Sequence, residues 1–307
     1  MNISMALALI SVLFVIALFP VLRHVSPRAP TEISVDGSQT VKLEKNLLRY
    51  AISGPKSSEG ILFLHGFNNQ LSAWSAVWPH LKNCGTQVRM DIPGYCGSVI
   101  GSNLGSNAYS LPAQAERVIA FIDALGFSRV TLVGVSMGGS LSAWIASNYP
   151  ERVKGLILLA PSGYPGSLQY GGIYGKLVKP GMLNRLATQI ASSGLYRSLY
   201  PDSRALQALS VTASYGDPWA EALGKIKTNS WVLWSRGDFG VHFNYAEAVA
   251  KTIPSSTFVP LAANAGHDIP GNRPELIAKL ACLVHKGTPH EQIMSEIKNI
   301  LSRNGDS

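Results

Sequence analysis

The chain has 307 residues, of which 46% are hydrophobic and 14% are charged, and its formal net charge is +8. This composition excludes an intrinsically disordered chain and fits one large domain, or one domain with an insertion. The charges form no blocks of like sign and no aromatic–basic pattern, so we expect no nucleic-acid partner. The sequence contains no CxxC pair and no HExxH motif, so we predict no metal site.

The chain begins with an apolar segment. Residues 3–22 are apolar apart from two serines and one proline, which is long enough to span a bilayer. No Lys or Arg precedes this run and no small-x-small cleavage site follows it. We therefore favour a membrane anchor within residues 1–23, with a cleaved signal peptide as the alternative. Arg23 and Arg28 favour a catalytic domain on the cytoplasmic side, with a secreted or periplasmic protein as the alternative. Residues 24–40 are interpreted as a linker.

The three cysteines are Cys84, Cys96 and Cys282. An odd and sparse set of this kind is not typical of a disulfide framework. Cys84 and Cys96 flank a predicted strand of about seven residues, which at about 3.3 Å per residue holds them too far apart to bridge.

Short apolar runs alternate with helical patterns along much of the chain. Extended segments are predicted at 41–52, 61–64, 86–92, 129–135, 153–159, 230–234 and 257–261. Helices are predicted at 72–81, 111–125, 137–149, 245–252, 274–284 and from Thr288 onward. The strand cores are continuously apolar, as expected of strands that helices cover on both faces. The pattern predicts an α/β fold with a mainly parallel sheet.

The alternation is interrupted between residues 162 and 228. This stretch has no clear buried strand and only short helical patches, at 183–191 and 203–209. We interpret it as a helical cap over the carboxyl edge of the sheet. The remaining segments, 41–161 and 229–307, would then form the core.

The segment Gly134-Val135-Ser136-Met137-Gly138 lies directly after a predicted strand and directly before a predicted helix. A serine at so sharp a turn has a strained backbone, and glycine two residues before and after it avoids a clash. The turn exposes the hydroxyl, and the next helix directs its first amides at a developing oxyanion. The spacing predicts that Ser136 is a nucleophile rather than an incidental serine in a glycine-rich turn.

A serine hydroxyl needs a base, and the base needs a carboxylate to orient it. His267 follows the last predicted strand and Asp238 the one before it, so both are expected at the edge that carries Ser136. Asp268 is expected to point elsewhere. No Asp or Glu occurs between Arg152 and Pro201, which excludes an acid after the strand that begins at Val153.

The other histidines have less defined roles. We expect His80, His285 and His290 to be solvated, place His65 in the loop after a strand, and regard His242 as a candidate pocket residue. For the oxyanion, the predicted donors are the backbone amides of Met137 and Phe67.

These motifs resemble those of the α/β-hydrolase superfamily, in the branch with esterases, lipases and carbon–carbon bond hydrolases. The resemblance covers about residues 45–160 and 228–287. It rests on His65-Gly66-Phe67, Asp91-Ile92-Pro93-Gly94, Gly134-Val135-Ser136-Met137-Gly138-Gly139, Arg236-Gly237-Asp238 and Gly266-His267. The loop that begins at Asp91 is one residue longer than the family pattern before its second glycine. Relatives that cleave carbon–halogen bonds or epoxides carry an aspartate where this chain has Ser136, which argues against both activities.

The resemblance and the triad imply hydrolysis of lipid-like or small acyl esters through an acyl-enzyme on Ser136, without a cofactor. A carbon–carbon bond hydrolase or an acyltransferase would use the same triad. A non-catalytic, membrane-anchored binding module is a further alternative, which the intact triad disfavours. The cap carries four basic residues between 162 and 201 and no acid, which suggests contact with anionic head groups; a solvated cationic surface is the simpler alternative. These residues are Lys176, Lys179, Arg185 and Arg197.

Overall fold

The computed structural model describes residues 15–22, 32, 34–101, 105–167, 181–200 and 203–306. Within them, eight strands form one sheet in the order β1-β2-β4-β3-β5-β6-β7-β8, parallel from β4 to β8. The strands are β1 (Ser38–Leu43), β2 (Asn46–Ser53), β3 (Glu59–Leu64), β4 (Thr86–Met90), β5 (Arg129–Val135), β6 (Val153–Leu159), β7 (Ser230–Ser235) and β8 (Ser256–Leu261). The mainly parallel α/β sheet expected from the sequence is confirmed.

The first extended segment is a hairpin rather than one strand. β1 pairs with β2 and β2 with β4, both antiparallel, and Glu44 has a φ of 52° at the turn. β1 begins at Ser38, so its first residues lie inside the segment interpreted as a linker.

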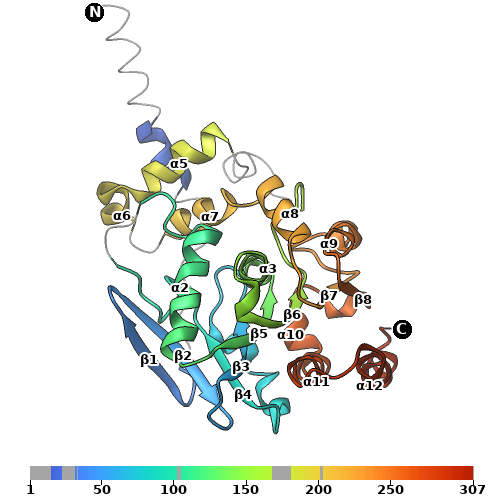
Figure 1. Cartoon of the computed structure of the whole chain (residues 1–307). Coiled ribbons are helices and arrows are strands. Elements are labelled where there is room, and N and C mark those ends of the chain that lie inside the picture. The colour runs from blue at the N-terminus through green and yellow to red at the C-terminus, as the bar shows by residue number, and fades with distance from the viewer. Residues whose placement is uncertain are drawn as a thin grey trace, which may run out of the picture.

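Helices cover both faces of the sheet (Figure 1). One face carries α2 (Leu111–Ala124), α3 (Met137–Asn148) and α9 (Ala246–Thr252), and the other carries α11 (Pro274–His285) and α12 (His290–Arg303). α2 begins where the Ser110 hydroxyl accepts a hydrogen bond from the Ala113 amide. The central strands β3, β5 and β6 are almost wholly buried, because both of their faces are covered.

The predicted helix at 72–81 is instead two 3₁₀ turns, η1 (Leu71–Trp74) and η2 (Trp78–Leu81). Pro79 lies in the first turn of η2, where its ring and missing N–H prevent the α-helical ladder from continuing.

The described part of residues 162–228 is helical. Its elements are α5 (Met182–Ser192), α6 (Gly194–Leu199), α7 (Ala205–Thr212) and α8 (Asp217–Gly224). α5 packs on α7, while α8 packs on α3, the helix that follows the Gly134–Gly138 turn. The described part of the interrupted stretch is therefore helical, and α8 joins it to α3.

The predicted anchor lies largely outside the described residues, because only 15–22 of its run 3–22 are described. Residues 15–22 are helical, with Leu18 and Leu22 buried and the Phe19 ring edge-on to Tyr196 of α6 at 5.3 Å. In the parts of the chain that the structure describes, no helix combines the length and apolarity needed to cross a bilayer.

A disulfide joins Cys84 to Cys282, which corrects the interpretation of the cysteines as unpaired. The two residues are 198 positions apart in sequence, but their Cα atoms lie 5.0 Å apart, because α11 packs on η2 just before β4. Cys96 is free, and the pair Cys84–Cys96 does not form, as the sequence predicted.

Candidate functional site

Ser136 occupies the strained turn that the sequence predicts between β5 and α3. Its φ is 54° and its ψ is −120°, a backbone conformation that residues other than glycine rarely adopt. A Cβ on Gly134 would lie 2.3 Å from the Gly138 carbonyl oxygen, and one on Gly138 would lie 2.2 Å from that of Leu64. Both flanking glycines are therefore required sterically.

Asp238 and His267 are brought together at the carboxyl ends of β7 and β8. The His267 Nδ1 lies 2.8 Å from the Asp238 Oδ2, and the Asp238 carboxylate is fully buried. The other oxygen, Oδ1, accepts hydrogen bonds from the amides of Gly240 and Val241, each at 2.8 Å. A carboxylate oxygen at this position can accept a hydrogen bond from the Nδ1–H tautomer of His267, which makes Nε2 the candidate base.

Ser136, His267 and Phe67 line one cavity of about 560 Å³. Its size is in the range of small-molecule sites. Its described lining is mostly apolar or small, with Asn69, Ser72 and Asp268 as further polar residues, and it contains no Lys or Arg. Asp268 caps the short helix α10 (Ile269–Asn272) rather than meeting His267, as expected. His242 is not among the described lining residues.

The two candidate oxyanion donors lie on either side of the serine. Met137 is the first residue of α3, so its amide is one of the free N–H groups at a helix start. The Gly66–Phe67 peptide approaches from β3, since a Cβ on Gly66 would lie 3.4 Å from the Ser136 Cβ.

His65 holds that peptide in place, a role that the sequence reasoning missed. Its Nε2 accepts a hydrogen bond from the Ile92 amide at 3.0 Å, so its Nδ1 carries the proton and donates to the Gly66 carbonyl at 2.7 Å. Complete burial lowers the pKa of His65 and keeps the ring neutral. Because the peptide is planar, fixing the Gly66 C=O also fixes the Phe67 N–H.

Tyr95 contacts the side chains of the two residues whose amides are the candidate donors, and this was also missed. Its hydroxyl lies 3.3 Å from the Met137 sulfur, and its ring meets the Phe67 ring edge-on at 5.9 Å. Tyr95 belongs to the loop that begins at Asp91. That loop closes on the buried Asp91, whose carboxylate accepts from the Gly97 amide and pairs with Arg49. Cys96, the residue before Gly97 in this loop, has a left-handed backbone with a φ of 45°.

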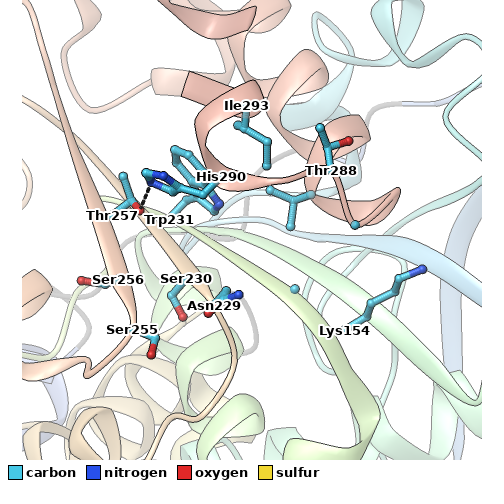
Figure 2. Close-up of a pocket in the computed structure, with 13 residues that line it drawn as sticks. Lys154, Asn229, Ser230, Trp231, Ser255, Ser256, Thr257, Thr288, His290 and Ile293 are labelled. Carbon is cyan, nitrogen blue, oxygen red and sulfur yellow. Dashed lines mark hydrogen bonds between the residues drawn. The ribbon is translucent and has the colours of Figure 1, made fainter. Parts of the chain in front are cut away.

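A second cavity, of about 340 Å³, lies at the opposite edge of the sheet, where β6, β7 and β8 begin (Figure 2). The exposed His290 stacks on Trp231 with ring centroids 5.3 Å apart and lies 2.9 Å from the Thr257 hydroxyl. Lys154 is paired with Glu59. His290 and Lys154 already have these partners, and among the described residues that line this cavity there is no Asp or Glu.

His285, near the second cavity, corrects a prediction. It was expected to be solvated but is buried and lies 3.2 Å from the Thr131 hydroxyl. His80, in contrast, is exposed as predicted.

Comparison with known proteins gives a consistent set of similarities. A family model for the alpha/beta hydrolase fold matches residues 60–192. The human monoacylglycerol lipase ABHD6 is 26% identical over 269 residues, covering 75% of this chain and 77% of the relative. A dihydrolipoyllysine-residue acetyltransferase component of the acetoin cleaving system, from Cupriavidus necator, is 28% identical, covering 72% of this chain and 61% of the relative. Among solved structures, a membrane phospholipase A described as a bacterial virulence factor superposes with a TM-score of 0.63 at 21% identity, covering 92% and 94% of the two chains.

Proposed function

Because the chain belongs to the α/β-hydrolase superfamily, in its esterase- and lipase-like branch, we propose that it is a carboxylic ester hydrolase that works through a serine acyl-enzyme. The observation that carries the proposal is the Asp238–His267 hydrogen bond in the cavity that also exposes the strained Ser136.

In the proposed reaction, the Ser136 Oγ attacks the ester carbonyl carbon while the His267 Nε2 takes its proton. The carbonyl oxygen becomes an oxyanion, which accepts hydrogen bonds from the amides of Met137 and Phe67. When the intermediate collapses, the alcohol leaves with the proton from His267, and the acyl group stays on Ser136. A water molecule then gives its proton to His267 and its oxygen to the acyl carbon, which releases the acid and restores Ser136.

The lining of the cavity favours a substrate with an uncharged, apolar acyl group. Phe67, Val135 and Phe239 give it apolar walls, and its described residues offer no cation to a carboxylate or phosphate. A lipid-like ester fits this lining. The name of the human relative, a monoacylglycerol lipase, supports the same class of substrate.

The test is turnover of p-nitrophenyl esters of increasing chain length by the full chain and by Ser136→Ala. We expect the substitution to lower kcat by at least about 1,000-fold, because it removes the hydroxyl that forms the proposed acyl-enzyme. Labelling by a fluorophosphonate probe should vanish in parallel. Ser72→Ala is the matched control, since Ser72 lines the same cavity. Equal labelling of Ser136→Ala and wild type would refute the proposed nucleophile.

We also propose that residues 3–22 associate the enzyme with a membrane, on the basis of their apolar sequence. Arg23 and Arg28 suggest that the catalytic domain lies on the cytoplasmic side, but we favour an oxidising compartment instead. The Cys84–Cys282 disulfide supports an oxidising compartment, because cytosolic thiols are kept reduced.

A further inference from the structure

The exposed apolar side chains of the described residues are concentrated at one end of the molecule. Nine large apolar residues are exposed, and five of them lie on the helix of residues 15–22, α5 and α6. They are Ile16, Met182, Leu183, Leu195 and Leu199, which we call the cap face. Figure 1 shows α5 and α6 at the end of the molecule remote from α11 and α12. Clustering on neighbouring helices distinguishes the cap face from the scattered apolar residues of an ordinary surface.

The helices that carry the cap face pack against one another. Phe19 contacts Tyr196 of α6, Leu18 and Leu22 are buried, and α5 packs on α6. These buried contacts orient the remaining side chains outward. On α6, Leu195 and Leu199 are one helical turn apart and are 64% and 57% exposed. On the helix of residues 15–22, the exposed positions are Ile16, Ala17 and Pro20, all of them apolar.

Charge and chain continuity indicate what this surface meets. Arg185 on α5 is exposed and Arg197 on α6 is half-buried, and the sequence contains no Asp or Glu from 153 to 201. A basic rim around exposed leucines suits anionic head groups above acyl chains. The apolar run that starts at Ile3 also enters the cap face at Ile16, so membrane association of that run would bring this face to the lipid.

We propose that the cap face docks on an anionic lipid bilayer, with Leu195 and Leu199 inserted among the acyl chains and Arg185 at the head groups. Docking would let the enzyme take its substrate from the bilayer. It rests on the proposed function only in the assumption that this substrate is a lipid-like ester. Lipid binding itself requires no residue of the catalytic cavity. A second copy of the chain is the competing occupant.

The first experiment compares two substrates for the full chain: a long-chain ester presented in phosphatidylglycerol-containing vesicles and a soluble butyrate ester. Leu195→Glu/Leu199→Glu should lower turnover of the vesicle substrate by at least about tenfold, because two leucines lose their burial in lipid. Turnover of the soluble ester should be retained, since both side chains are exposed. Val99→Glu is the matched control, with 57% exposure on a loop outside the cap face. The proposal would be overturned if the double variant turned over the vesicle substrate as fast as the wild type. It would also be overturned if Val99→Glu lowered that turnover by the same factor.

A second experiment separates docking from catalysis. Amide hydrogen exchange is measured for full-length Ser136→Ala in nanodiscs, with and without Leu195→Glu/Leu199→Glu. We expect residues 194–199 to exchange more slowly without the glutamates, while α12 exchanges equally in both proteins. Equal exchange at 194–199 would refute docking even if ester hydrolysis is confirmed. Slow exchange there in a protein that hydrolyses no ester would support docking and refute only the proposed function. If the glutamates convert a dimer to a monomer and leave vesicle turnover intact, the occupant is a second copy and the proposal fails.

Discussion

A histidine and serines lie in a cavity at each of the two edges of the sheet, but the groups that contact the histidine differ. At the carboxyl edge, His267 meets a buried carboxylate beside a strained serine. At the amino edge, the contacts of His290 with described residues are to a threonine hydroxyl and a tryptophan ring, in a cavity that also contains serines. A serine and a histidine that share a cavity therefore do not by themselves make the hydrogen-bonded arrangement found at the carboxyl edge. The difference lies in backbone geometry and in the buried charge that orients the base.

The largest expected effect comes from breaking the strained turn of the carboxyl edge. Gly138→Ala places a Cβ 2.2 Å from the Leu64 carbonyl oxygen and 2.4 Å from that of His65, and backbone atoms cannot give way easily. We expect ester turnover to fall more than about 100-fold through displacement of Ser136 and Met137. The free energy of unfolding should fall by about 1–3 kcal/mol.

Gly224→Ala is the control for this variant. Gly224 is the last residue of α8. A Cβ at this position would have the Thr252 carbonyl oxygen, 4.0 Å away, as its nearest neighbour. It should leave turnover unchanged and stability equal or higher by up to about 1 kcal/mol. Normal turnover by Gly138→Ala would show that the turn tolerates a side chain and that the strain argument is wrong.

The next largest effect concerns the amino edge, where the disulfide ties α11 to the segment before β4. Cys84→Ser/Cys282→Ser should lower the free energy of unfolding by about 2–5 kcal/mol, measured in urea, because the bond closes a long loop. Ester turnover at 25 °C should persist, since the bond lies at the edge away from Ser136. Cys96→Ser controls for the loss of a thiol. Unchanged wild-type stability after addition of reductant would contradict this prediction.

A smaller effect is expected from the rim of the catalytic cavity. The Phe239 side chain is 84% exposed, and its ring centroid lies 6.3 Å from that of His267. If it covers the bound acyl chain, Phe239→Ala should lower kcat/KM for long-chain esters by about threefold to tenfold and leave short esters unaffected. Val99→Ala, exposed elsewhere, should change neither. A uniform loss across all chain lengths would instead indicate a disturbed Asp238 loop.

The same contrast explains what could be predicted from the sequence. Ser136, Asp238 and His267 follow strands whose apolar cores are readable, so the parallel sheet determines where their backbones meet. The Cys84–Cys282 pair could not be predicted, because it depends on how α11 packs on η2 across a separation of 198 residues. Tyr95 was missed for a similar reason, since its partner Phe67 follows β3 and its partner Met137 begins α3.

The burial of His285 was also unpredictable, and it should be detectable as a small dependence of stability on pH. Burial lowers the pKa of His285 in the folded chain, while the unfolded chain keeps the ordinary value of about 6.5. Below that pH the unfolded state binds a proton that the folded state does not, so stability is complete above about 6.5 and is lost as the pH falls. His65 contributes in the same direction, because its pKa is also lowered by burial. His285→Gln should therefore flatten, but not abolish, the decline in the free energy of unfolding between about pH 8 and pH 5, measured in urea. The exposed His80→Gln should leave the slope unchanged, and a His285→Gln curve parallel to that of the wild type would show that His285 is protonated equally in both states.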